Sequence, residues 1–319
     1  MQLATVIILF LVGIVFIIKG GDFFVDAASW IAEVSGVPKL IVGATIVSLA
    51  TTMPEMLVSV MAAAEGKVDM AIGNAVGSVT ANIGLIMAIS LICIPAAIKR
   101  RDYLLKSVCM LAAAVVVVVS GVQGSVGTVA SIVLVVIFLV FLWENISSAK
   151  RSMLEKHEEE TKRPKPGRKE IIKNIILFVV GAAGIIVGAD LLVDNGSELA
   201  RYIGISERII GVTVIAIGTS LPELITTITA IVKKESSLSV GNILGANIID
   251  LSLILPVSSL VSGKALPISA VSGSLDLPAC LLVGCVAVVP AMISERFRRW
   301  QGILLLAIYV GYVYMTCVA

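Results

Sequence analysis

Charged side chains are scarce in this chain of 319 residues. Asp, Glu, Lys and Arg make up 14% of the sequence and hydrophobic residues 58%, whereas soluble proteins carry about 25% charged residues. This shortage excludes an ordinary soluble domain. It leaves apolar stretches of roughly 17 to 25 residues, each long enough to cross the hydrocarbon core of a bilayer as a helix. We therefore expect a polytopic membrane protein.

Histidine and cysteine are also rare. The one histidine, His157, lies in a charged segment, and the five cysteines lie in apolar runs without metal-ligand spacing: Cys93, Cys109, Cys280, Cys285 and Cys317. A disulfide framework, a histidine or cysteine metal centre and a membrane-embedded metalloenzyme are therefore not expected. We expect no enzymatic activity, no resident cofactor and no nucleic-acid partner.

Ten apolar stretches predict an all-α fold of ten transmembrane helices. Leu3 to Ile18 lacks a basic region and a cleavage site, so we expect a retained helix and not a signal peptide. Residues 150–170 are rich in charge and contain two prolines, and we expect a solvated linker there. The predicted helices span 3–30, 40–64, 68–96, 103–120, 125–149, 171–198, 208–232, 237–261, 267–292 and 300–317.

The basic residues gather on one side of the predicted topology. The odd-numbered connections include the cluster Lys99–Arg101, the linker 150–170 and the pair Lys233–Lys234, whereas only Lys67, Arg201, Arg208 and Lys264 fall on the other side. Cytoplasmic loops of membrane proteins carry an excess of Lys and Arg. We therefore expect a cell-membrane protein with a cytoplasmic linker and both termini outside.

The sequence contains a repeat. GATIVSLATTMPE at 43–55 and GVTVIAIGTSLPE at 211–223 share a glycine, a threonine, a hydroxyl pair, a proline and a glutamate, all displaced by 168 positions. GNAVGS at 73–78 returns with the same offset as GNILGA at 241–246. Two motifs in one frame exclude a chance resemblance.

The repeat divides the chain into two halves. Residues 1–149 and 171–319 each contain five predicted helices, and the linker 150–170 joins them. Because five is odd, the second copy must enter the membrane from the opposite face, which makes this an inverted repeat. Transporters with this architecture hold their substrate near the membrane midplane, where the halves meet.

Each copy of the first motif combines an acid with a helix breaker. Glu55 and Glu223 are ionisable residues at membrane depth, which is costly and typical of a functional site. Pro54 and Pro222 lack a backbone donor, so the helix must open before each of them. A bound cation can satisfy the carbonyl oxygens that are released.

Polar residues continue from these motifs at helical spacing. Hydroxyl, amide and carboxylate oxygens in this arrangement suit Ca²⁺, with six to eight ligands, or Na⁺. Three carboxylates would balance one divalent or several monovalent ions; we hypothesise obligatory exchange, although protonation of one acid would change the charge. The four stripes are Ser48, Thr51, Thr52, Glu55 and Ser59; Ala216, Thr219, Ser220, Glu223 and Thr227; Asn74, Ser78 and Asn82; and Asn242, Ala246 and Asp250.

Structural explanations compete with ion binding at several of these positions. A proline can simply kink a membrane helix, and Ser and Thr often bond back to their own backbone. Asn74 and Asn242 could hold neighbouring helices together. We expect capping or interface roles at Asp22, Asp26, Asp190 and Asp194. The glutamate pair fits a structural role least, because buried carboxylates without cations are so unfavourable.

Residues 43–82 and 211–250 resemble the two signature repeats of the sodium/calcium exchangers, particularly the short prokaryotic type. The resemblance implies ten helices, with the second, third, seventh and eighth around the ions and the first and sixth sliding across them. It implies that Glu55 and Glu223 bind Ca²⁺ together with the carbonyl groups of Thr51 and Thr219. For sodium it implies Thr51, Thr52, Ser78 and the Ser48 carbonyl, then Thr219, Ser220 and the Ala216 carbonyl, with Asn82 and Asp250 as a central pair.

One position departs from the family pattern. Ala246 stands where relatives often carry a serine whose hydroxyl meets sodium, so the number or affinity of sodium ions is in question. We predict an antiporter that exchanges Ca²⁺ for Na⁺, moves Ca²⁺ outward and needs only one chain in the lipid bilayer. The alternatives are a Ca²⁺/H⁺ or K⁺-dependent exchanger and, with less support, a cation channel.

Overall fold

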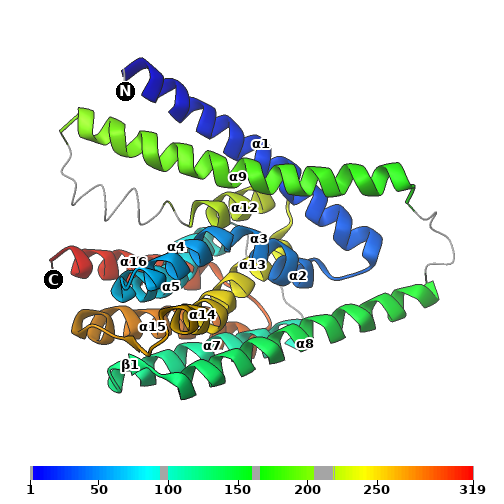
Figure 1. The fold of residues 1–319 in the computed structure, drawn as a ribbon. Coiled ribbons are helices and arrows are strands. Elements are labelled where there is room, and N and C mark those ends of the chain that lie inside the picture. Colours follow the sequence, from blue (N-terminus) through cyan, green and yellow to red (C-terminus); the bar gives the residue numbers. More distant parts are fainter. Residues whose placement is uncertain (1–2, 94–99, 160–165, 205–217, 219, 319) are drawn as a thin grey trace.

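The structure is a computed structural model that describes residues 3–93, 100–159, 166–204, 218 and 220–318. Within these ranges nearly every residue is helical (Figure 1). The elements in chain order, with η marking π-helical turns, are α1 Leu3–Ser35, α2 Lys39–Val42, η1 Gly43–Val47, α3 Ser48–Thr51, α4 Met53–Ala64, α5 Val68–Ala81, η2 Asn82–Met87, α6 Ala88–Cys93, α7 Arg100–Val122, β1 Ser125–Val126, α8 Thr128–Glu159, α9 Arg168–Tyr202, α12 Leu221–Val232, α13 Ser236–Ile249, η4 Asp250–Ile254, α14 Leu255–Ser262, β2 Leu266–Pro267, η5 Ser272–Asp276, α15 Leu277–Ser294 and α16 Arg299–Val318.

Long apolar helices dominate the described part of the chain. Seven of them are long and apolar enough to cross a bilayer, or eight if the bent pair Lys39–Thr51 and Met53–Ala64 forms one span. The predicted all-helical, multi-pass membrane fold is therefore confirmed. Of the predicted seventh helix, 208–232, only Leu221–Val232 and two isolated residues before it lie within the described residues.

Both helix boundaries at the predicted linker differ from the sequence-based expectation. Helix α8 continues from the predicted end at 149 to Glu159, and α9 already begins at Arg168. Much of the segment predicted to be a solvated linker is therefore helical. The physical reason is that Glu, Lys and Arg are good helix formers, so charge ends the membrane span without ending the helix.

The predicted helix starts at 125 and 267 are wrong. The short strand β1 pairs there with β2 in antiparallel register, with Val126 opposite Leu266. Gly124 and Gly263 have positive φ angles of 82° and 68°, a conformation that ends a helix at little cost for glycine. The strand pair joins the turn after α7 to the turn after α14.

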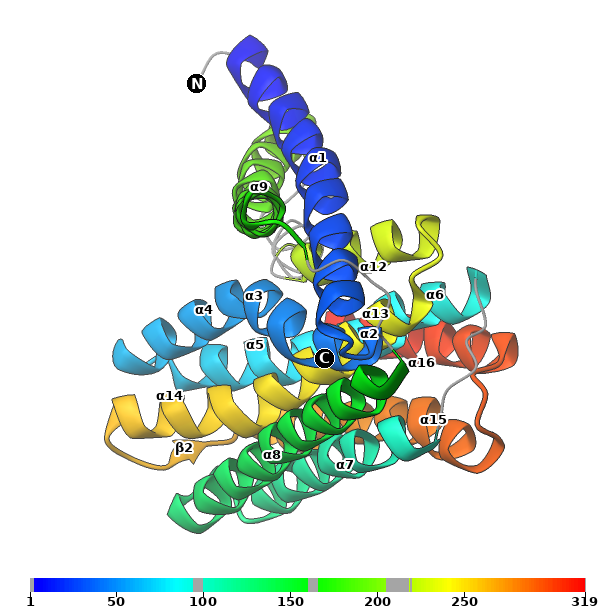
Figure 2. The same ribbon diagram turned by 90° about the vertical axis from the view of Figure 1, so that its right-hand side faces the viewer.

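The helices form layers. Helices α1 and α9 lie side by side along one side of the molecule, and α7 and α8 lie along the opposite side, with the remaining helices between them (Figures 1 and 2). Glycines allow α1 and α9 to approach closely: a Cβ atom at Gly20 would lie 2.8 Å from the carbonyl oxygen of Gly181. Such small residues are typical of tightly packed membrane helices.

Ion pairs link α1 to the turn between α12 and α13. The ammonium group of Lys233 lies 2.7 Å from Asp26 and 3.4 Å from Asp22. Lys39, at the start of α2, similarly lies 2.5 Å from Glu235. The predicted interface role is confirmed for Asp22 and Asp26. Because these groups are partly exposed, each pair contributes little stability, about 0–1 kcal/mol.

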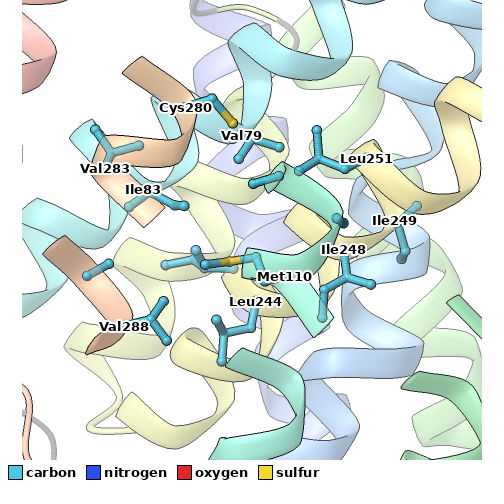
Figure 3. Packing of buried hydrophobic residues seen from close by; sticks show 14 of the residues in the cluster. Val79, Ile83, Met110, Leu244, Ile248, Ile249, Leu251, Cys280, Val283 and Val288 are labelled. Carbon is cyan, nitrogen blue, oxygen red and sulfur yellow. The ribbon is translucent and has the colours of Figure 1, made fainter. Parts of the chain in front are cut away.

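The largest apolar cluster supports the helices that carry the second motif. Val79 of α5, Met110 of α7, Leu244 of α13 and Val283 of α15 are all buried in it (Figure 3). The layer of α7 and α15 therefore backs α5 and α13, and the polar faces of these helices are placed by the packing of their apolar faces.

Candidate functional site

The second predicted helix is broken at its proline. Helix α3 ends at Thr51, α4 begins at Met53, and the two segments are bent by 47° relative to each other. Pro54 occupies the first turn of α4, where a missing backbone donor is tolerated. The predicted opening of the helix before Pro54 is therefore confirmed, and it separates the backbone of α3 from that of α4.

The first polar stripe faces the protein interior. All five of its side chains are buried, with at most 3% of the residue exposed at Thr51. The apolar residues on the opposite face are exposed instead, with 48% of Leu49 and 54% of Leu57 accessible. This division is expected of a helix with one face toward lipid and one toward a polar site. The members of the buried face are Ser48, Thr51, Thr52, Glu55 and Ser59.

The repeat-related helix is described from Ser220 onward. Helix α12 begins at Leu221 with Pro222 in its first turn, and Ser220, Glu223 and Thr227 are buried. Ala216 and Thr219, which were predicted as ligands, lie outside the described residues. Pro222 thus lies in the first turn of α12, as Pro54 lies in the first turn of α4.

The second motif places its polar residues at matching turns. Asn82 is the first residue of η2 and Asp250 is the first residue of η4, and both are buried. A π-helical turn widens the helix and is frequent at functional sites. The repeat offset relates the two turns, but no sequence signal used above predicted that the helices would widen there.

Glycines bring α13 against the first broken helix. A Cβ atom at Gly241 would overlap the carbonyl oxygen of Leu40, and one at Gly245 would overlap the hydroxyl of Ser48. These two glycines therefore let α13 approach the first broken helix closely. Around Gly73 and Gly77 no described atom lies within 4 Å of such a Cβ. Their repeat-related neighbours fall in residues 205–217, outside the described part.

Hydrogen bonds connect the two halves at this point. The hydroxyl of Thr52 donates to Oε1 of Glu223 at 3.2 Å. The hydroxyl of Thr51 donates to Oδ1 of Asn242 at 3.2 Å and also lies 3.3 Å from the carbonyl oxygen of Ser48. Residues predicted from separate copies of the repeat therefore meet in one place.

The amides of Asn74 and Asn242 join neighbouring helices. Asn74 donates to the carbonyl oxygen of Glu55 at 3.1 Å and to the hydroxyl of Ser59 at 2.9 Å. Asn242 donates to Thr226 at 3.3 Å. These contacts are the interhelical bonds that the sequence left as one of two possibilities, and Thr226 is a participant that the repeat did not indicate.

Several buried oxygen atoms of the site have no hydrogen-bond partner among the described residues. They include both carboxylate oxygens of Glu55 and of Asp250, and Oε2 of Glu223. Glu55 is also within electrostatic range of Glu223 and Asp250. Such groups are costly to bury unless a counter-charge is present. The further unpartnered atoms are Oδ1 of Asn82 and the hydroxyls of Ser220 and Thr227.

The acidic groups do not form a compact carboxylate cluster. Within the described residues, no three side chains of the His, Cys, Asp and Glu types are placed to hold one metal ion. Any cation here would therefore need neutral oxygen atoms as well, from hydroxyls, amides or backbone carbonyls. Ser78 is buried with 4% exposure, but Ala246, its counterpart, is fully buried and offers no side-chain oxygen.

Asn247 is a second buried polar residue of the site, after Thr226, that the sequence reasoning missed. Asn247 is fully buried and accepts a hydrogen bond from Nδ2 of Asn82 at 3.2 Å. Its counterpart at the repeat offset is Val79, so a search for repeated polar positions passes over it. An amide in an apolar helix, one turn before Asp250, was the signal that could have found it.

Fold and site together define a polytopic membrane protein with a buried, oxygen-lined centre at a broken helix. A family model described as sodium/calcium exchanger protein matches residues 5–146 and 173–318. The chain therefore belongs to the sodium/calcium exchanger family, as the sequence resemblance indicated.

Individual relatives match nearly the whole chain. The sodium/calcium exchanger MaX1 of Methanosarcina acetivorans is 32% identical, over 96% of this chain and 97% of the relative. The inner membrane protein YrbG of Escherichia coli is 33% identical, over 99% and 97%. Among solved structures, the sodium-calcium exchanger NCX_Mj soaked with 100 mM Na⁺ and 10 mM Sr²⁺ is similar, with a TM-score of 0.81, 29% identity and coverage of 98% and 99%.

Proposed function

We propose that this protein is a secondary antiporter that exchanges Ca²⁺ for Na⁺ by alternating access and, driven by the sodium gradient, exports Ca²⁺. The observation that carries the proposal is the group of buried carboxylate oxygens that lack a partner among the described residues: both oxygens of Glu55 and of Asp250, and Oε2 of Glu223. Burying such oxygens without a counter-charge destabilises the protein, and a bound cation therefore stabilises it. When no ion is bound, the uncompensated negative charge should oppose the change between the two access states. Exchange of one ion for another is therefore obligatory in this proposal.

The proposed ligands are those that the family resemblance implies for this sequence. We assign Ca²⁺ to Glu55 and Glu223 with the carbonyl oxygens of Thr51 and Thr219. The sodium ions are assigned to the hydroxyls and carbonyls around them: Thr51, Thr52, Ser78 and the Ser48 carbonyl in the first half, Thr219, Ser220 and the Ala216 carbonyl in the second, and Asn82 with Asp250 between them. Hard oxygen donors of this kind suit both ions.

The architecture that fits this site is an inverted repeat of ten helices. The halves are residues 1–149 and 171–319, and the family model also matches in two segments, 5–146 and 173–318. The charge distribution supports a cytoplasmic linker and external termini in the cell membrane. Because both halves belong to one chain, a monomer suffices.

Alternating access requires one part to move against another. Helices α1 and α9 pack closely on each other through glycines, and they lie against α2 and α12 on one side of the molecule (Figure 2). We infer that this pair slides as a unit across the rest of the protein, exposing the site first to one side of the membrane and then to the other.

Uptake of ⁴⁵Ca²⁺ into proteoliposomes tests the proposed coupling. Vesicles loaded with Na⁺ and diluted into Na⁺-free buffer should accumulate ⁴⁵Ca²⁺, whereas vesicles with equal Na⁺ on both sides should not. Uptake that follows an imposed proton gradient and ignores Na⁺ would replace the proposal with Ca²⁺/H⁺ exchange. Uptake that also requires internal K⁺ would identify a K⁺-dependent exchanger. Flux of Ca²⁺ down its own gradient without any counter-ion would identify a channel.

A further inference from the structure

Asn247 breaks the two-fold pattern of the site. Asn247 is a fully buried polar residue, and its counterpart in the first half, Val79, is buried but apolar. A buried amide is unfavourable unless both of its ends have partners. The presence of this amide beside Asn82, and its absence from the corresponding position of the first half, therefore needs an explanation.

The partners of Asn247 distinguish the two ends of its amide. Nδ2 of Asn247 lies 3.8 Å from the sulfur of Met110, and Oδ1 lies 3.2 Å from Nδ2 of Asn82. A thioether sulfur accepts a hydrogen bond weakly and cannot donate one. Met110 itself is held in the apolar cluster near Leu244 and Ile248 (Figure 3). The NH₂ end of Asn247 therefore belongs at the sulfur, and its carbonyl end belongs at Asn82.

This orientation dictates the orientation of Asn82. Because Asn247 presents an acceptor, Asn82 must present its NH₂ group to it, and Oδ1 of Asn82 turns away. That oxygen is buried and has no partner among the described residues. An amide oxygen can bind a cation, but an amide NH₂ group cannot. The direction of this one amide thus decides whether Asn82 is a ligand.

We propose that Asn247 is a positioning residue that, together with Met110, holds the carbonyl oxygen of Asn82 toward the transported cations. This inference rests on the proposed function, since it places Asn82 in the ion site. It also explains the asymmetry. Asp250, the repeat counterpart of Asn82, presents an oxygen whichever way its carboxylate turns, and so the first half needs no orienting amide.

The test measures the Na⁺ dependence of ⁴⁵Ca²⁺ exchange for Asn247→Leu. Without the acceptor, Asn82 can rotate its NH₂ group into the site, so the Na⁺ concentration for half-maximal exchange should rise about tenfold, with turnover at saturating Na⁺ within about twofold of the unchanged protein. Asn145→Leu is the matched control, because Asn145 is a buried amide of α8 with an unpartnered Oδ1 whose NH₂ group donates to its own helix. It should leave the half-maximal concentration unchanged.

A second background separates positioning from general damage. In Asn82→Asp the central residue offers an oxygen in either orientation, so adding Asn247→Leu should produce no further shift. An equal shift in both backgrounds would overturn the proposal. If Asn247→Leu fails to fold, Met110→Leu, which removes only the sulfur acceptor at similar volume, should give a smaller shift in the same direction, and no shift would equally overturn it.

Failure of the proposed function gives a different result. Thermal unfolding in detergent can be followed with Na⁺, K⁺ or Ca²⁺ alone, and the cation that stabilises the unchanged protein reports binding without any exchange. If exchange is not driven by Na⁺, but Asn247→Leu still weakens stabilisation by whichever cation binds, the coupling is wrong and the positioning role holds. If Asn247→Leu leaves that stabilisation intact, the positioning role is wrong.

Discussion

At the scale of single residues, substitutions of Glu55 and Glu223 test the proposed ion site most directly. Replacing either by Gln keeps the shape but removes a charge, and losing one charged partner of a buried site costs about 3–5 kcal/mol, on the order of 100-fold or more in binding. We expect Glu55→Gln and Glu223→Gln each to reduce ⁴⁵Ca²⁺ exchange to background.

The same variants should still fold. Both oxygens of Glu55 are buried and have no hydrogen-bond partner in the part of the chain that the structure describes, so a neutral amide relieves an unfavourable burial when no ion is bound. Gel filtration should give a single symmetric peak, and the melting temperature in ion-free buffer should not fall. Full exchange activity in either variant would remove that residue from the ion site.

Ala246 offers a gain-of-function prediction at the same scale. Ser78 carries a buried hydroxyl at the related position, whereas Ala246 is fully buried without one. Ala246→Ser adds a neutral oxygen ligand worth about 0.5–1.5 kcal/mol, so the Na⁺ concentration for half-maximal exchange should fall roughly two- to twelvefold. Ser78→Ala should change it in the opposite direction. An unchanged Na⁺ dependence in Ala246→Ser would show that sodium does not bind beside this position.

At the scale of elements, the contact of α13 with the broken helix depends on Gly245. A Cβ atom there would lie 2.6 Å from the carbonyl oxygen of Ala44, a distance that real side chains do not adopt. Gly245→Ala should therefore separate the helices, lower the melting temperature and abolish exchange. The matched control is Gly311→Ala in α16, where no described atom lies within 4 Å. It should be neutral or stabilising by about 0.5–1 kcal/mol. Equal effects of the two substitutions would contradict the role of the close contact.

At the scale of the whole molecule, a disulfide between α1 and α12 tests the proposed sliding of α1 and α9. A Cβ atom at Gly21 of α1 would lie 3.7 Å from Cβ of Thr229 in α12, within the range of natural disulfides. In a variant lacking the native cysteines, oxidised Gly21→Cys/Thr229→Cys should lose exchange and recover it on reduction.

A second cross-link serves as the control for this experiment. A Cβ atom at Gly13 would lie 3.1 Å from Cβ of Leu191, which joins α1 to α9 within the proposed moving pair. Natural disulfides have Cβ atoms about 3.5–4.5 Å apart, so the two helices must separate by a few tenths of an ångström to form this bond. Oxidised Gly13→Cys/Leu191→Cys should retain exchange. Arrest by both cross-links would mean that α1 and α9 move relative to each other, and arrest by neither would exclude sliding of α1 against α12.

Much of the site was accessible from the sequence because it is local and repeated. The hydroxyl stripe through Thr51 and Glu55 follows from helical spacing, and the break at Pro54 follows from a missing backbone donor. The extension of α8 to Glu159 and the strand at Ser125 were not predicted. Helix α8 extends beyond its apolar run because the charged residues that follow are good helix formers. At Ser125, pairing with the distant strand β2 outweighs helix propensity.

The sequence by itself determined the membrane fold, the family and the two related sets of oxygen-bearing residues, because hydropathy, helical periodicity and a constant offset of 168 are properties of neighbours along the chain. Only the tertiary structure decided which groups meet: Thr52 with Glu223, Asn82 with Asn247, and Asn247 with Met110. Hydrogen bonds and close packing depend on distances of a few ångströms between segments far apart in the chain. A repeat that predicts equal halves could not reveal the amide that makes them unequal.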